Sequence, residues 1–263
     1  LPILGADVAG TVEAVGPNVK QFQPGDAVFG DLCEGGWCGL AEYVCARETA
    51  LTLKPAGMTF EQAAATPQAG VLALQGLRDK RPVQPGQKVL INGAGGGVGT
   101  FAVQMAKSFG AEVTGVDSLA KLATLRSLGA DHVIDYTQED YTQTDRQYDL
   151  IVDVVARRSI SDYKRALTPQ GTFVVIGGSI ATILQTATLG TWYSKPEGQQ
   201  MSLLMHRPNK DLASIIALFE SGQVVPVIDK CYPLPEAAEA IRYLGAGHAK
   251  GKVVITVERA LSP

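Results

Sequence analysis

Apolar and polar positions follow two different rhythms along the chain, and the change falls near residue 85. Beyond it, apolar residues at 98, 101, 102, 105, 106 and 109 recur at helical spacing, which predicts a helix over 98–109. Short apolar runs between turn residues are typical of buried parallel strands, and they occupy 88–92, 112–117, 132–135, 150–153, 172–176 and 201–205. Strands that alternate with helices in this way predict an α/β fold with a doubly wound parallel sheet.

The first 55 residues instead show short segments between glycine and proline turns, which is typical of β structure. We expect strands over 11–15, 27–29 and 41–44. Thr59 and Gln62 have the spacing of a capping box, so a helix is expected over 60–66, before Pro67. The remaining expected elements are helices over 70–77, 119–128, 212–219 and 235–244 and a strand over 252–257.

Composition excludes several classes of protein. Basic and acidic residues number 23 and 26, which gives a net charge of −3 without any basic block, so no nucleic-acid partner is expected. No apolar run approaches the ~20 residues that span a bilayer, so no membrane partner is expected. The four cysteines are too few for a disulfide framework, and with no recognisable signal peptide they favour a cytoplasmic protein.

A glycine cluster separates the expected strand over 88–92 from the helix that follows. Read as the pattern G-x-G-x-x-G, it places Ala94, Gly96 and Gly99 at the three glycine positions. The middle glycine lets a pyrophosphate approach the backbone, and the helix N-terminus attracts its charge, so Gly96, Gly97 and Val98 are candidate contacts. Asp117 follows about twenty residues later, as the dinucleotide fingerprint requires. A plain glycine turn is the alternative.

The segments 89–99 and 102–107 resemble the medium-chain dehydrogenase/reductase superfamily. The segments 5–12, 24–30, 127–136 and 251–254 resemble its catalytic domain and its zinc-free quinone-oxidoreductase branch. The resemblance implies a Rossmann domain over 67–222 and a partial GroES-like β domain over 1–66 and 223–263. It also implies that strands supplying part of the substrate pocket precede Leu1, so we expect an N-terminally truncated member.

The choice between NADPH and NADH depends on signals that conflict. An acidic residue at the end of the second strand binds the ribose hydroxyls of NAD and repels a 2′-phosphate, which favours NADH at Asp117. The resemblance implies 2′-phosphate contacts at Lys121 and Tyr136, and Ser118 could add a donor. On the resemblance we favour NADPH and keep NADH open. The alternatives are a solvated helix residue for Lys121 and a half-buried loop aromatic for Tyr136.

The resemblance also implies which residues face the nicotinamide and the substrate. It places Val155 and the turn Gly177-Gly178-Ser179 beside the nicotinamide, and it makes Tyr43 and Gln68 weak candidates for the substrate pocket. Because a quinone or a conjugated enone is already activated for hydride, we assign no catalytic proton donor. The expected enzyme is an NAD(P)H-dependent oxidoreductase that reduces such a small molecule without a metal.

No zinc is expected. Cys33, Cys38 and Cys45 lack the paired spacing of a zinc site, and Ala6 stands where the resemblance places the histidine ligand of zinc alcohol dehydrogenases. Two alternatives stay open: a zinc-free NAD-linked alcohol dehydrogenase or reductase, and an inactive NAD(P)H-binding sensor or scaffold. A hydrolase with Ser179 as nucleophile is a weaker alternative. The apolar run over 201–205 could be an exposed sheet edge, which favours a homodimer.

Overall fold

The computed structural model describes residues 3–194 and 198–257. The chain divides into two compact units, Leu1–Val71 with Arg207–Pro263 and Leu72–His206, and each is described here by itself. This division places 207–222 in the first unit, whereas the sequence favoured assigning that stretch to the Rossmann domain. The predicted domain ranges, 1–66 with 223–263 and 67–222, stay a prediction.

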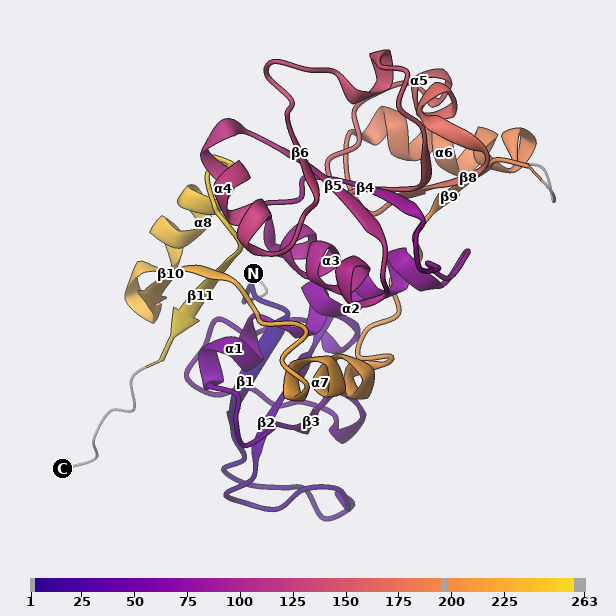
Figure 1. Ribbon diagram of the computed structural model, residues 1–263. Coiled ribbons are helices and arrows are strands. Elements are labelled where there is room, and N and C mark those ends of the chain that lie inside the picture. The colour runs from indigo at the N-terminus through magenta and orange to yellow at the C-terminus, as the bar shows by residue number, and fades with distance from the viewer. Residues whose placement is uncertain (1–2, 195–197, 258–263) are drawn as a thin grey trace. The chain divides into compact units, whose positions relative to one another are not determined.

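The second unit is built on a six-stranded parallel sheet with the order β6-β5-β4-β7-β8-β9 (Figure 1). Its strands are β4 (Lys88–Asn92), β5 (Glu112–Asp117), β6 (His132–Asp135), β7 (Tyr148–Asp153), β8 (Leu167–Val175) and β9 (Gln200–Leu203). The order reverses between β4 and β7, and open sheets of this kind bind ligands at such a point, outside the carboxyl ends of the strands. The predicted doubly wound parallel sheet is confirmed.

Helices flank this sheet because its strands are apolar on both faces. Val89, Leu90 and Ile91 of β4 are fully buried, so both faces of the strand need a cover. The helices are α3 (Gly97–Ser108), α4 (Leu119–Ser127), α5 (Ile160–Ala166) and α6 (Ile180–Tyr193), and α6 packs beside β9 (Figure 1). Helices α5 and α6 were not predicted from the sequence. A capping box of Ser159 and Asp162 begins α5.

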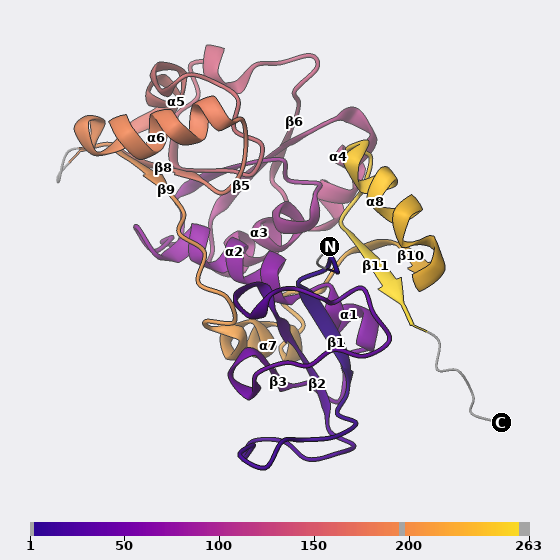
Figure 2. The same cartoon turned by 180° about the vertical axis from the view of Figure 1, so that it is seen from behind.

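The first unit contains two small sheets. One is antiparallel with the order β1-β2-β3, and the other pairs β10 with β11 in parallel, beside α8 (Figure 2). Their bounds are β1 (Asp7–Thr11), β2 (Ala27–Asp31), β3 (Thr52–Leu53), β10 (Ile228–Pro233) and β11 (Lys252–Thr256). The helices are α1 (Phe60–Ala64), α7 (Leu212–Glu220) and α8 (Ala237–Gly245), and α2 (Pro67–Arg78) leads into the second unit. The predicted capping box of Thr59 and Gln62 is confirmed.

Two predicted strands of the first unit are wrong. The strand predicted over 11–15 lies at Asp7–Thr11, because those five residues pair with β2, and Val12 beyond them still exchanges hydrogen bonds with Gly25 and Asp26. The segment 41–44 is not a strand, since it has no pairing partner and Tyr43 is 73% exposed.

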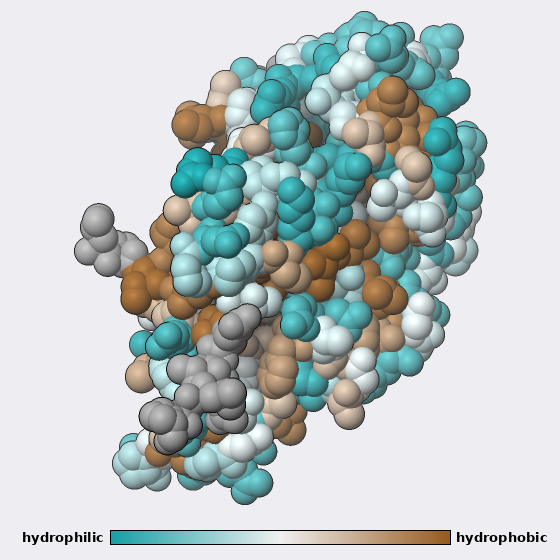
Figure 3. Space-filling view, turned by 90° about the vertical axis from the view of Figure 1, so that its left-hand side faces the viewer, coloured by the Kyte–Doolittle hydropathy of each residue, from teal (hydrophilic) through white to brown (hydrophobic). Residues whose placement is uncertain are grey.

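The surface carries hydrophobic side chains in several places. On the face drawn in Figure 3, hydrophilic side chains predominate and hydrophobic ones gather in separate areas. Exposed large hydrophobic residues include Ile241 and Leu244 of α8 and Ile180 and Leu184 of α6. Among the residues that the structure describes, none of the helices combines the length and the apolar character needed to cross a membrane.

Candidate cofactor site

The loop that joins β4 to α3 holds the glycine cluster in a tight turn. The N–H groups of Gly93 and Ala94 both donate to the carbonyl oxygen of Val116, at 3.0 and 3.1 Å, which fastens the loop to β5. A Cβ on Gly99 would lie 2.2 Å from the carbonyl oxygen of Gly93. Only glycine at this position therefore lets α3 approach the loop so closely.

Gly96, Gly97 and Val98 form the open side of this loop. All three are partly exposed, and Gly96 is the N-cap residue of α3. The first N–H groups of an α-helix have no partner within the helix, and the aligned peptide dipoles make this end electropositive. The loop therefore has the shape and the polarity that a pyrophosphate group requires.

The carboxylate of Asp117, at the end of β5, is held by donors on both oxygens. Its Oδ2 accepts the N–H of Gly95 and its Oδ1 accepts the N–H of Ser118, both at 2.8 Å. The Nζ of Lys121 lies 3.5 Å from Oδ1, and only 10% of the lysine side chain and 8% of the aspartate side chain are exposed. A Cβ on Gly95 would lie 2.7 Å from Cδ of Lys121, so the lysine stem packs against the loop.

Tyr136 joins the same group from the end of β6. Its N–H donates to the carbonyl oxygen of Asp117 at 3.2 Å, while 55% of the residue is exposed. The structure thus brings Asp117, Ser118, Lys121 and Tyr136 together beside the glycine loop. The alternative for Lys121, a solvated helix residue, is wrong because its side chain is buried. The exposure of Tyr136 is compatible both with a contact to a 2′-phosphate and with a half-buried loop aromatic.

The residues expected at the nicotinamide also lie together. The N–H of Ala156 donates to the carbonyl oxygen of Gly177 at 2.9 Å, and the N–H of Ser179 donates to that of Ala156 at 2.7 Å. A Cβ on Gly178 would lie 2.2 Å from the same Ala156 oxygen, so the two segments run in close contact. Val155 is 43% exposed, and its Cγ2 would touch a Cβ on Gly93 at 3.3 Å. This edge of the sheet is therefore shared by the ends of β4, β7 and β8.

A buried carboxylate that the sequence analysis did not single out lies beneath this edge. Asp153, the last residue of β7, is fully buried. Its Oδ1 accepts the Nδ2 of Asn92 and the N–H of Val155, both at 2.9 Å, and its Oδ2 accepts the hydroxyl of Tyr163 at 2.9 Å. Burial raises the pKa of Asp153 to about 6, although these donors oppose the shift. An acidic residue at the end of an apolar run was the signal in the sequence.

The two candidates for the substrate pocket belong to the first unit. The N–H of Gln68, at the start of α2, donates to Oδ1 of Asp7 at 3.0 Å, and Nζ of Lys252 lies 3.2 Å from Oδ2 of the same carboxylate. Burial raises the pKa of Asp7, and Lys252 opposes that shift. Tyr43 lies on an exposed loop instead. The structure therefore fixes the backbone of Gln68 and leaves the role of Tyr43 a prediction.

The hydrolase alternative takes Ser179, Asp229 and His248 in Ser-Asp-His order, and the hydrogen bonds of Ser179 and Asp229 do not support it. Ser179 is the N-cap of α6, and its Oγ accepts the N–H of Thr182 at 3.2 Å. Within the first unit, Asp229 accepts the hydroxyl of Tyr243 at 2.7 Å and the N–H of Lys250 at 3.0 Å. Ser179 and Asp229 thus each have a local structural role.

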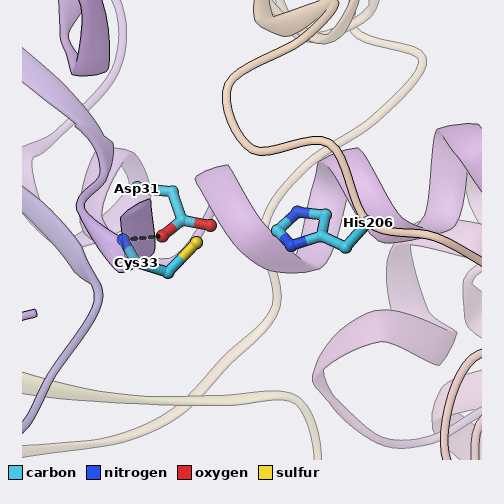
Figure 4. A group of neighbouring side chains, drawn as sticks. All are labelled: Asp31, Cys33 and His206. Carbon is cyan, nitrogen blue, oxygen red and sulfur yellow. Dashed lines mark hydrogen bonds between the residues drawn. The ribbon is translucent and has the colours of Figure 1, made fainter. Parts of the chain in front are cut away.

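Metal-ligating residue types occur near residue 31 (Figure 4). Asp31 and Cys33 belong to the first unit, where the N–H of Cys33 donates to Oδ1 of Asp31 at 2.8 Å. His206, drawn with them, is the last residue of the second unit, so neither unit holds all three residues. Burial, aided by Asp31, raises the pKa of the Cys33 thiol to about 12. All four cysteines are free.

Three family models match the chain. The model described as "Alcohol dehydrogenase GroES-like domain" matches residues 1–76, and the one described as "Zinc-binding dehydrogenase" matches 128–255. The model described as "Alanine dehydrogenase/PNT, C-terminal domain" matches 63–157. Together these matches include both units.

Curated proteins and solved structures that resemble the chain are also oxidoreductases. A 2-methylene-furan-3-one reductase from Solanum lycopersicum is 36% identical over 95% of this chain and 62% of its own length. The mitochondrial NAD(P)H oxidoreductase RTN4IP1 from Mus musculus is 34% identical over 97% of this chain and 70% of its own length. The structure of a quinone oxidoreductase from Coxiella burnetii matches 98% of this chain and 80% of its own, with a TM-score of 0.85 and 31% identity. The chain thus spans somewhat less than two thirds of the tomato reductase.

Proposed function

Because the chain belongs to the medium-chain dehydrogenase/reductase superfamily, in its quinone-oxidoreductase-like branch, we propose that it reduces a quinone or an α,β-unsaturated carbonyl with NADPH and without zinc. The names of the relatives support the reaction class, since they specify a conjugated ketone, NAD(P)H and a quinone. A nicotinamide cofactor follows from the family, and the preference for NADPH is our proposal.

The observation that carries the proposal is the position of Asp117. A carboxylate that selects NADH uses its oxygens to accept the ribose hydroxyls, and each hydrogen bond that those oxygens already accept lowers their capacity to do so. Here both oxygens accept backbone N–H groups, and the ammonium of Lys121 lies beside one of them. The charge of Asp117 is thus largely balanced within the protein. The hydroxyls of Ser118 and Tyr136, together with Lys121, then offer a 2′-phosphate three donors.

The chain's own residues fit the rest of the cofactor. Gly96, Gly97 and Val98 would hold the pyrophosphate at the N-terminus of α3, where a side chain at 96 would fill the cradle. Val155 and the turn 177–179 would fix the nicotinamide plane against the sheet edge and keep water away from one side. The bound cofactor supplies the hydride. The protein's part is to bind, orient and desolvate.

The absence of zinc is proposed from the donor set. Ala6 has no side-chain ligand atom, and Cys33, Cys38 and Cys45 lack the paired spacing of a zinc site. A quinone accepts hydride without a Lewis acid, so the proposed reaction needs no metal. We also propose a homodimer joined at β9, which lies at the end of the sheet order, and a cytoplasmic location.

Cofactor choice is tested by titrating the chain with NADPH and with NADH, by fluorescence. We expect tighter binding of NADPH, and we expect Lys121→Met, which keeps the packing stem, to weaken NADPH binding about tenfold while NADH changes little. Lys107→Met is the matched control, because Lys107 is also paired, with Asp131 at 2.7 Å, on a neighbouring helix. Asp117→Asn tests the alternative that Asp117 binds the ribose hydroxyls of NADH. A loss of NADH affinity of about tenfold or more in this variant would support that alternative.

The reaction is tested by following NADPH oxidation with 1,4-benzoquinone and with 3-penten-2-one. Turnover of either supports the proposal. Reduction of NAD⁺ by a simple alcohol, without turnover of quinone or enone, would favour the zinc-free alcohol dehydrogenase instead. Binding of NADPH without any turnover would favour the sensor or scaffold.

A further inference from the structure

The buried carboxylate of Asp153 joins four separate segments of the second unit. Beyond Asn92 and Val155 on Oδ1, its Oδ2 accepts the hydroxyl of Tyr163 at 2.9 Å and that of Tyr141 at 3.4 Å. The donors come from the end of β4, the turn after β7, α5 and the short helix Tyr141–Gln143. One carboxylate therefore holds together segments that are far apart in sequence.

Burying a carboxylate at position 153 is less favourable in free energy than filling the same space with an apolar side chain. A charge in a fully buried place is unfavourable unless hydrogen bonds compensate for its lost hydration, and a leucine would pack there without that penalty. The compensation here is nearly complete, because both oxygens accept two hydrogen bonds each. Only a carboxylate can accept from Asn92 and Val155 on one oxygen and from two phenols on the other.

The hydrogen bonds to Asp153 form a network that fixes the carboxyl ends of β4, β7 and β8, where the nicotinamide is proposed to lie. Asn92 immediately precedes the glycine loop, and its carbonyl oxygen also accepts the N–H of Val154 at 3.0 Å. The main-chain oxygen of Asp153 accepts the N–H of Ile176 at 2.9 Å, next to the turn that begins at Gly177. Asp153 thus sets the ends of β4, β7 and β8 relative to one another through its side chain and its backbone.

We propose that Asp153 is a positioning residue of the cofactor site, which holds Val155 and the end of β4 in the geometry that orients the nicotinamide. The proposal rests on the proposed function. The adenosine end of the site is independent of this network, because Gly93 and Ala94 are fastened to Val116 and the group around Asp117 lies on β5, α4 and the end of β6. Loss of the carboxylate should therefore disturb one end of the cofactor and spare the other.

The titratable groups around Asp153 give the network a pH dependence. Tyr141 and Tyr163 face the carboxylate, and burial raises the pKa of both phenols, so they stay donors throughout the accessible pH range. The cation Arg158, which is paired with Asp140 at 2.6 Å, partly opposes the raised pKa of Tyr141. Protonation of Asp153 near its raised pKa of about 6 would turn one acceptor into a donor and break the pattern.

The test compares Asp153→Asn with the wild type using two probes. NADPH with 1,4-benzoquinone reports on nicotinamide positioning, and 2′,5′-ADP, which lacks the nicotinamide, reports on the adenosine end. We expect Asp153→Asn to lower kcat about tenfold and to bind 2′,5′-ADP like the wild type. We also expect the wild-type kcat to rise with pH near 6 and the variant to lack this step. Asn92→Ala keeps the carboxylate and should show the same kinetic split, so it serves where Asp153→Asn does not fold.

A matched control is Thr172→Val, since Thr172 is a buried polar residue of β8 whose hydroxyl has no hydrogen-bond partner among the described residues. Its kinetics should equal those of the wild type. Unchanged kcat and pH profile in Asp153→Asn, or an equal loss of 2′,5′-ADP binding, would overturn the proposal in favour of a purely structural role. A wild type that binds 2′,5′-ADP and NADPH but reduces no quinone or enone would instead contradict the proposed function.

Discussion

Alanine at either of two glycines of the cofactor loop, three residues apart, should weaken NADPH binding, but only one of the two substitutions should lower stability. An alanine Cβ at Gly99 would lie 2.2 Å from the carbonyl oxygen of Gly93 and 2.5 Å from Cα of Ala94, and both neighbours are backbone atoms. A Cβ at Gly96 would lie 3.4 Å from its nearest neighbour, the same Gly93 oxygen. The first substitution collides with the protein, whereas the second enters the space proposed for the pyrophosphate.

The magnitudes follow from these distances. Relief of the contact at Gly99 requires the loop to move by roughly 1 Å, and overpacking of this kind costs about 1–3 kcal/mol. At ~2–4 °C for each kcal/mol, Gly99→Ala should lower Tm by several degrees. Gly96 has φ of −90°, which alanine adopts readily. The loss of a glycine N-cap and the smaller entropy of the unfolded chain offset each other there, so stability should change by less than about 0.5 kcal/mol.

The assay pairs thermal unfolding with titration by NADPH. Gly96→Ala should unfold like the wild type and bind NADPH about tenfold more weakly. Gly99→Ala should lose both stability and binding. The reasoning about the loop is refuted if Gly99→Ala is as stable as the wild type. The assignment of the pyrophosphate is refuted if Gly96→Ala binds NADPH with unchanged affinity.

Four further results are expected. Thr59→Ala removes the capping box of α1 and should cost about 1 kcal/mol in urea unfolding, whereas Thr59→Ser should cost little, and equal losses would contradict the capping role. Burial raises the pKa of Asp153 from 3.8 to about 6, so the native state binds more protons than the unfolded chain between these values. The contribution of Asp153 to the free energy of unfolding is therefore fully present below about pH 4, and it falls by about 3 kcal/mol as the pH rises through 6. Asp153→Asn should lack this fall, and parallel curves of unfolding free energy against pH for variant and wild type would contradict it. Dialysis against a chelator should leave quinone reduction unchanged, and restoration of lost activity by Zn²⁺ would overturn the zinc-free proposal. Met205, 74% exposed just after β9, is the site for Met205→Glu, which should convert the proposed dimer to a monomer in light scattering, and an unchanged mass would refute an interface at this edge.

The strands of the second unit could be predicted closely because their environment is simple. The predicted bounds of β4, β5 and β6 match the structure, since apolar runs buried on both faces are bounded by turn residues. Helix α6 was missed because threonines interrupt its apolar pattern. The hydroxyls of Thr186 and Thr188 donate to the carbonyl oxygens four residues earlier, at 2.8 and 2.7 Å, which satisfies them inside a helix but gives no periodic signal in the sequence.

The candidate site also had one part that could be predicted from the sequence and one part that could not. The glycine loop could be predicted because its parts are consecutive, and a local motif places them on one strand, one turn and one helix. The network around Asp153 could not, because its donors lie between residues 92 and 163 and meet only when the sheet has formed. A lone acidic residue at the end of an apolar strand is also compatible with an exposed strand end. Its burial, which decides its role, is a property of the packed sheet.

Asp117 shows why the motif alone does not decide between NADPH and NADH. The rule that an acidic residue at the end of the second strand favours NADH assumes that its oxygens face the ribose. In this chain the N–H of Gly95 takes one oxygen, and the N–H of Ser118 and the ammonium of Lys121 share the other. The same carboxylate then orders the loop and holds the lysine in place. Our proposal is therefore that the acidic residue supports the binding of a 2′-phosphate, and the affinities of Asp117→Asn for the two cofactors test it.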